Sequence, residues 1–130
     1  MTPVTCTVRD ETTAGDVLHA LELQLASETL DVGALIEARV NQEVRAHNGA
    51  PSEPFAGLVE PVARETAANG TRPVARIDAG RQVAVAKEAF LRGRVLILVD
   101  DRQVTELDER VTLRPGGHVT FLKLVPIVGG

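Results

Sequence analysis

The closing third of the chain, residues 95–130, constrains the fold most, because it alternates strand-forming runs with two turn signals. Val95–Val99 reads VLILV, and such a run of branched or aliphatic residues is typical of a strand buried on both faces. Asp100 and Asp101 predict a turn after it, since a short Asp side chain tolerates left-handed backbone. We therefore expect a strand, a tight turn and a short return strand over residues 102–105.

A second turn and a final strand lead to the last residues. Residues 114–117 read RPGG, in which the proline fixes φ and the glycines permit unusual backbone. Residues 118–125 predict a long strand with apolar side chains on both faces. Pro126 lacks an amide hydrogen and should end regular pairing. Residues 126–130, PIVGG, are then expected to be an extended, flexible tail.

The VLILV run also bears on partner binding. Val95, Ile97 and Val99 alternate with Leu96 and Leu98, so only one of the two sets can face a helix. The other set either lies beneath the middle segment of the chain or forms an exposed apolar patch. Leu96 and Leu98 are therefore a candidate partner surface.

The first half of the chain predicts a hairpin followed by a helix. Residues 4–9 and 21–25 alternate apolar and polar side chains, and the polar residues 10–16 between them read as a loop. Thr29 or Asp31 is the expected N-cap of the helix. The helix should end at Asn48-Gly49 and bury a stripe at helical spacing, namely Val32, Leu35, Ile36, Val40 and Val44.

The middle of the chain, residues 49–93, is less regular and reads as a helical insertion. Prolines and glycines break its first part, where Phe55, Leu58 and Val59 are expected to dock on the core and residues 62–68 to form a short helix. Asp78 predicts the N-cap of a second long helix over residues 79–91, whose expected apolar stripe is Ala79, Val83, Ala86 and Phe90.

Together these elements predict one α+β domain over residues 1–130, with a mixed sheet packed on one main helix. The first and last strands should lie parallel at the sheet centre, because the long connection between them supplies the crossover that a parallel pair needs.

Composition argues against several functions. A net charge of −4 and few aromatic residues disfavour nucleic acid as a partner. The absence of a membrane-length apolar run and of a signal pattern predicts a soluble, cytoplasmic protein with no membrane partner. The lone Cys6 reads as a buried hydrophobe, and the three scattered histidines show no metal-ligand or Cys-His spacing. We expect no catalytic residues, no metal and no enzyme activity.

The terminal Gly-Gly allows two interpretations. It is either a flexible end without chemistry, or a carboxyl end that an enzyme draws through a narrow channel, where residues without a Cβ let the backbone pass. The acidic side chains of residues 100–109 likewise form either a solvated face or a docking surface for a basic partner.

The order of these motifs resembles a known family. A hairpin, a helix after Ser-Glu-Thr-Leu at 27–30, the sequence LILVDDRQV at 96–104 and a last strand ending in Gly-Gly resemble the β-grasp fold of ubiquitin-like proteins. RPGGHVTFLKLVPIVGG at 114–130 is similar to the bacterial sulfur carriers of molybdopterin and thiamine biosynthesis. The resemblance covers residues 3–48 and 94–130, whereas residues 49–93 depart from it.

This resemblance implies a protein substrate rather than an enzyme. An activating enzyme would adenylate the Gly130 carboxylate with ATP and magnesium, and no cofactor would be bound by the chain itself. Gly129 would let the end reach the active site, and Ile127 and Val128 would be the apolar grip of the tail on that enzyme. The expected partners are the activating enzyme, a target protein, and a conjugating enzyme and deconjugating protease.

Three functions remain open at this point. The chain is a ubiquitin-like modifier joined to a target amine by an isopeptide bond, a sulfur carrier with a terminal thiocarboxylate, or a β-grasp interaction module whose tail is inert. The long insertion favours the modifier. The chain has only two lysines, Lys87 and Lys123, so single modification is expected over lysine-linked polymers.

Overall fold

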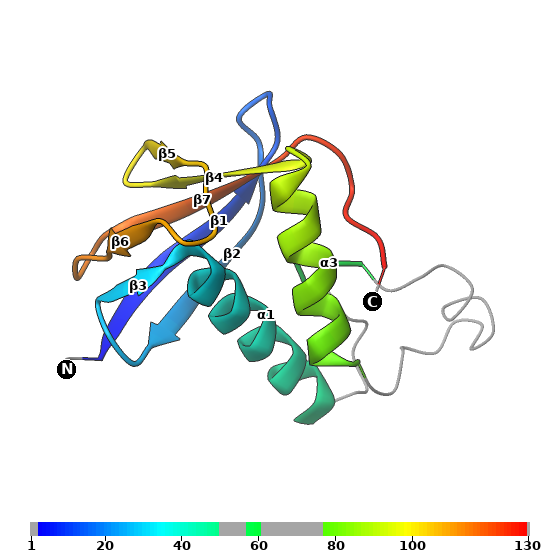
Figure 1. The fold of residues 1–130 in the computed structure, drawn as a ribbon, viewed down its shortest axis with the longest axis horizontal. Coiled ribbons are helices and arrows are strands. Elements are labelled where there is room, and N and C mark those ends of the chain that lie inside the picture. The colour runs from blue at the N-terminus through cyan, green and yellow to red at the C-terminus, as the bar shows by residue number, and fades with distance from the viewer. Residues whose placement is uncertain (1–2, 50–56, 61–76, 130) are drawn as a thin grey trace.

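Segments from opposite ends of the chain lie side by side at the centre of a five-stranded sheet (Figure 1). The computed structural model describes residues 3–49, 57–60 and 77–129. Within it, β1 (Val4–Glu11) pairs in parallel with β7 (His118–Lys123), in the strand order β2-β1-β7-β4-β5. The predicted parallel pair at the sheet centre is confirmed, and the architecture is α+β.

The hairpin and the return strand complete the mixed sheet. β2 (Val17–Leu25) lies antiparallel to β1, and β4 (Val95–Val99) lies antiparallel to both β7 and β5 (Arg102–Val104). Asp100 and Asp101 form the tight turn between β4 and β5 with φ of 48° and 69°, in the left-handed region that the sequence predicted for them. Gly116, in the second predicted turn, has φ of 81°.

A second, two-stranded sheet was not predicted. β3 (Thr29–Asp31) pairs antiparallel with β6 (Arg110–Thr112). These strands have only three residues each, too few to display an alternation that sequence reasoning can detect. Their pairing places the start of the first helix against the loop after β5, where the amide of Gly33 donates to the Leu107 carbonyl at 2.8 Å.

The predicted first helix is α1 (Val32–Gly49). Asp31 is its N-cap, since its Oδ1 accepts a hydrogen bond from the amide of Ala34 at 2.6 Å. All five predicted stripe residues are buried, with at most 3% of any side chain exposed, namely Val32, Leu35, Ile36, Val40 and Val44.

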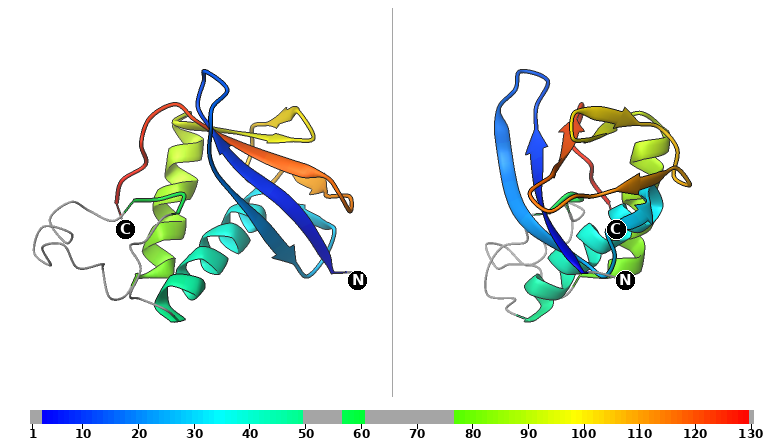
Figure 2. Two further views of the ribbon diagram at one scale, coloured as in Figure 1. Left: turned by 180° about the vertical axis from the view of Figure 1, so that it is seen from behind. Right: turned by 90° about the vertical axis from the view of Figure 1, so that its left-hand side faces the viewer.

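The predicted second helix is α3 (Ala79–Leu91), capped by Asp78 through the amide of Arg81 at 3.2 Å. Ala86 and Phe90 are buried as expected, whereas Ala79 and Val83 are only partly buried against the core. Both helices cover the same face of the sheet and pack on each other (Figure 2). The core therefore rests on two helices rather than one.

The core lies between the helices and this face of the sheet. The described part of the insertion adds Leu58 and Val59, each 1% exposed, which confirms their predicted docking, whereas Phe55 and residues 62–68 lie outside the described residues. Cys6 is buried as expected. Burial, together with the charges of Glu22 and Asp100, raises the pKa of its thiol to about 11.

Three predicted boundaries are wrong, and the simplest case is β2, which begins at Val17 rather than at residue 21. Asp10 was assigned to the hairpin loop but lies within β1, where it is 2% exposed, because a basic side chain from α1 pairs with it. The last strand ends at Lys123 rather than at residue 125, because its ladder partner β4 begins at Val95, the residue opposite Lys123. Val125 is consequently 45% exposed. Among the described helices, none combines the length and apolar character needed to cross a membrane.

Candidate functional site

The C-terminal segment turns back from the sheet and runs along α3 (Figures 1 and 2). Just after β7, the amide of Leu124 donates a hydrogen bond to the Arg94 carbonyl at 3.0 Å. Residues 127–129 then lie against the body of the protein instead of projecting from it as the sequence predicted. Gly130, the proposed reacting residue, lies outside the described residues.

Backbone hydrogen bonds join this segment to the described part of the insertion. The amide of Glu60 donates to the Ile127 carbonyl at 2.7 Å, and the amide of Gly129 donates to the Glu60 carbonyl at 2.9 Å. Glu60 and Val128 thus form a parallel bridge outside the main sheets. The side-chain amide of Gln82, on α3, donates to the Gly129 carbonyl at 3.5 Å.

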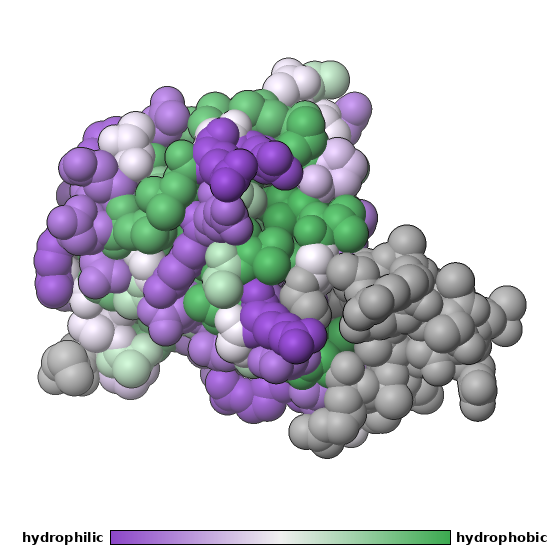
Figure 3. Space-filling model, turned by 45° about the vertical axis from the view of Figure 1, so that its right-hand side comes forward, coloured by the Kyte–Doolittle hydropathy of each residue, from purple (hydrophilic) through white to green (hydrophobic). Residues whose placement is uncertain are grey.

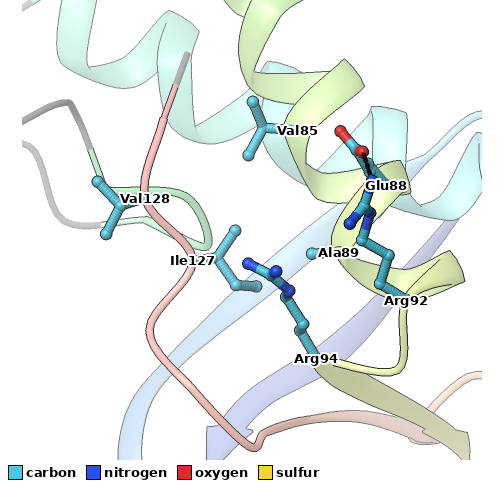
Figure 4. A pocket seen from close by; sticks show the side chains of 7 residues that line it. All are labelled: Val85, Glu88, Ala89, Arg92, Arg94, Ile127 and Val128. Carbon is cyan, nitrogen blue, oxygen red and sulfur yellow. Dashed lines mark ion pairs between the residues drawn. The ribbon is translucent and has the colours of Figure 1, made fainter.

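The two residues predicted to grip an activating enzyme point in opposite directions. Ile127 is directed towards α3 and is 3% exposed, whereas Val128 points away from the helix and is 53% exposed (Figure 4). An extended chain alternates its side chains in this way. In this arrangement Val128 is accessible to a partner, and Ile127 is part of the core.

Gly129 is favoured by the backbone conformation and the packing of the segment itself. Its φ is 148°, a value that residues with a side chain rarely adopt. A Cβ at this position would lie 3.2 Å from Cγ2 of Val85 on α3, closer than ordinary van der Waals contact. The glycine therefore has a structural cause inside the fold, in addition to the role that the family resemblance implies.

A cavity of about 300 Å³ lies between α3 and the docked segment (Figure 4). Arg92 and Glu88, at the C-terminal end of α3, form an ion pair of 2.9 Å at this site. Hydrophobic residues gather on this face of the molecule between hydrophilic side chains (Figure 3). The cavity is lined by Val85, Glu88, Ala89, Arg92, Arg94, Ile127 and Val128.

The predicted partner surface lies on the opposite face of the sheet. Val95, Ile97 and Val99 are buried towards the helices, whereas Leu96 and Leu98 are half-buried on the other side. Leu96 lies opposite Leu122 of β7, and Leu98 opposite Thr120. The described part of the insertion does not cover these residues, because Leu58 and Val59 belong to the core on the helix side.

A buried cluster of charges was missed by the sequence analysis. The guanidinium of Arg39 is fully buried and forms two hydrogen bonds with the Asp10 carboxylate, the one to Oδ2 at 2.6 Å. It also contacts Glu43 at 3.3 Å and lies 4.5 Å from the ring centre of Phe121. Positions 39 and 43 follow Leu35 at intervals of four residues, on the same side of α1 as the apolar stripe. Helical periodicity alone could therefore have predicted that both side chains are buried.

This cluster also supports the segment that holds the tail. Glu43 Oε1 accepts a hydrogen bond from the amide of Leu58 at 3.1 Å. Burial alone would lower the pKa of Arg39, but the hydrogen bonds and charges of Asp10 and Glu43 outweigh it and hold that pKa above its usual value. Arg39 thus stays charged and keeps Glu43 in place beneath Leu58.

The acidic residues after β4 do not form a uniform acidic face. Glu109 pairs with Arg102 at 3.3 Å and accepts from the amide of Thr105 at 3.1 Å. The Thr105 hydrogen bond, followed by the bond and charge of Arg102, lowers the pKa of Glu109. Arg110 and Arg114 line the same shallow hollow as Arg102. Arginines therefore lie among these carboxylates and partly neutralise the acidic surface that a basic partner would bind.

The histidines have separate surroundings. His118 contacts the carboxylates of Asp100 and Asp101, at 3.7 and 3.3 Å, beside the turn after β4. His47 lies in the last turn of α1 and is buried. In the ranges that the structure describes, no group of three or more His, Cys, Asp or Glu side chains is arranged to hold a metal ion.

Comparison with known proteins gives no relative for this chain: no protein-family model matches it, and neither a curated protein nor a solved structure does.

Proposed function

We propose that the chain is a ubiquitin-like protein modifier with a β-grasp fold, whose C-terminal carboxylate is activated and transferred to an amine of a target. The observation that carries this proposal is the strand order. β1 and β7 are parallel neighbours at the centre of the mixed sheet, α1 follows the β1–β2 hairpin, and β7 is the last strand before the Gly-Gly segment.

The chemistry would take place at Gly130 in the active sites of partner enzymes. The carboxylate attacks the α-phosphate of ATP, with magnesium bound by the activating enzyme, and pyrophosphate leaves. A thiolate of an activating or conjugating enzyme then attacks the acyl carbon and AMP leaves. The target amine finally displaces the thiolate and forms the isopeptide bond, which a deconjugating protease would hydrolyse. The chain is the substrate of every step.

The half-buried apolar residues of β4 supply a partner surface for such a modifier. Leu96 and Leu98 continue across the sheet into Leu122, and all three lie on the face opposite the helices. Contiguous exposed apolar patches mark protein-interaction sites, and these three partly exposed leucines would contribute to one on this face. A receptor that recognises the conjugated protein would bind here, away from the tail.

The docked tail supports a second candidate, an interaction module that is never conjugated. Since Val85 and the positive φ already account for a glycine at position 129, this glycine does not by itself require an activating enzyme. The chemical state of Gly130 in cells is the better discriminator, because conjugation or thiocarboxylation would change its carboxylate and an interaction module would leave it unchanged.

Mass spectrometry of the protein isolated from its native cells tests the proposal. A modifier gives peptides in which Gly130 is joined to a lysine of another protein. The intact mass of its unconjugated form corresponds to a chain whose last residue is Gly130. A mass increase equal to the exchange of one oxygen for sulfur identifies the sulfur carrier instead.

The matched control for this experiment is the chain without Gly129 and Gly130, expressed from the same locus. The modifier proposal requires all branched peptides to disappear in that strain. If neither branched peptides nor a thiocarboxylate is found in the wild type, and the shortened chain keeps full biological activity, the interaction module is correct.

A further inference from the structure

We infer that residues 127–129 are a tail latch, in which the body of the protein holds its own C-terminal segment and withholds it from an activating enzyme. Ile127, Val128 and Gly129 are the held residues, and Glu60, Gln82 and Val85 hold them. The regulatory meaning of the latch depends on the proposed function, whereas the docking itself does not.

The docked geometry is incompatible with use of the tail as a substrate. An enzyme that acts on the carboxyl end must surround the last residues as an extended chain, because its nucleotide and nucleophile have to reach the terminal carbon. Here Ile127 is 3% exposed, and the backbone of residues 127 and 129 is bonded to Glu60. The tail must leave these contacts before Gly130 can be activated.

The receptor is formed by groups that match the tail closely. At position 129 a Cβ would approach Cγ2 of Val85 to 3.2 Å, and the φ of 148° would strain any residue with a side chain, so the receptor favours glycine. Gln82 is 1% exposed, and its buried amide is directed at the Gly129 carbonyl. Glu60 uses both its amide and its carbonyl on the tail. Residues 127–129 are therefore held in three ways: by packing against Val85, by the buried amide of Gln82 and by backbone hydrogen bonds to Glu60.

The latch is also arranged so that a partner can open it. Val128 is the exposed residue of the segment and points away from α3 (Figure 4). A partner that binds this side chain first would pull on a chain held mainly by backbone hydrogen bonds to one residue, Glu60. Ile127 would then leave the core and become the second apolar contact. This geometry indicates that the tail would detach in order, first at the exposed Val128 and then at the buried Ile127.

Substitution of the receptor, rather than of the tail, tests the latch without changing the substrate. Val85→Glu places a larger, charged side chain against Gly129 and should displace the tail. Ala84→Glu is the matched control, since it adds the same charge to the neighbouring, exposed position of α3. Circular dichroism and thermal unfolding establish that both variants are folded.

Amide hydrogen exchange of the full-length protein is the first readout. The amides of Glu60 and Gly129 should be protected in the wild type and in Ala84→Glu. In Val85→Glu they should exchange at least about tenfold faster, the change that the loss of one to two hydrogen bonds produces. Carboxypeptidase digestion followed by intact mass should likewise remove Val128 and Ile127 faster from Val85→Glu than from the other two proteins.

The results separate the latch from the proposed function. Unprotected amides at Glu60 and Gly129 in the wild type overturn the latch whether or not Val85→Glu folds, and so does equal digestion of all three proteins. A latch confirmed by exchange, in a protein that never forms branched peptides in cells, leaves the docking intact and rejects the modifier. If the protein is a modifier, Val85→Glu should form conjugates faster than Ala84→Glu.

Discussion

The guanidinium of Arg39 lies inside the fold, between two carboxylates and an aromatic ring. It bonds to Asp10 on β1 and to Glu43 on α1, over the face of Phe121 on β7. Within the described residues, no buried side-chain nitrogen or oxygen lacks a hydrogen-bond partner. Burying charges costs free energy, which their pairing offsets only if every member is present. The cluster thus ties a helix to the two central strands.

Replacement of Arg39 by Met should destabilise the protein by about 3–5 kcal/mol, because two buried carboxylates lose the guanidinium that bonds to both of them. Lys123, 4.0 Å from Asp10, is too distant to replace its hydrogen bonds. Asp10→Val should cost less, since Arg39 keeps Glu43 as its partner. The double variant Asp10→Val, Arg39→Met should recover part of the loss, because apolar groups then replace both members of the pair. Urea unfolding of the four proteins measures these differences. A double variant less stable than Arg39→Met would contradict this account.

At the scale of elements, the end of α1 is joined to the start of α3. The side chain of Asn48 donates to the Ile77 carbonyl at 3.1 Å and accepts from the Ile77 amide at 2.9 Å. One amide side chain therefore satisfies both backbone groups of a residue just before the N-cap of α3. This contact sets the position of the helix that receives the tail.

Asn48→Ala should lower the free energy of unfolding by about 1–3 kcal/mol, because it removes two part-buried hydrogen bonds and leaves the backbone groups of Ile77 without them. Asn41→Ala is the control, since it makes the same change on the same helix. Thermal unfolding should show a clearly lower midpoint for Asn48→Ala alone. Equal midpoints for the two variants would show that the contact does not stabilise the junction between α1 and α3.

At the scale of the whole molecule, the chain closes on itself. Its first and last strands are neighbours, and the segment after the last strand returns to the helix layer. Both lysines are engaged in this arrangement. Lys87 Nζ lies 3.0 Å from Glu37 between the two helices, and Lys123, whose side chain is 15% exposed, lies 4.0 Å from Asp10.

If the chain is a modifier, its conjugates should therefore carry single copies rather than lysine-linked polymers. An amine held in an ion pair, or largely buried, is a poor nucleophile for an activated carboxyl group. The variant Lys87→Arg, Lys123→Arg keeps both positive charges and removes both acceptors. Its conjugates should have the same sizes as those of the wild type on denaturing gels. A wild-type ladder that collapses in the double variant would refute the expectation.

The amino-acid sequence by itself determined the features that depend on neighbouring residues. The apolar spacing from Val32 to Val44 defined α1, Asp78 marked the start of α3, and Asp100 and Asp101 marked the turn after β4. The long connection between the first and last strands supplied the crossover that their parallel pairing needs. Helical or strand periodicity and turn preferences depend on residues that are close in the sequence. They can therefore be predicted without the rest of the fold.

Only the tertiary structure decided what distant partners control. Asp10 belongs to a polar run that predicts a loop, but Arg39 pairs with it inside the fold. Ile127 belongs to a predicted free tail, but Glu60 and α3 hold it against the body of the protein. The residues next to Asp10 and Ile127 in the sequence do not reveal which distant groups will contact these side chains. Their burial depends on whether folding brings a complementary group to each of them, and that is a property of the assembled structure.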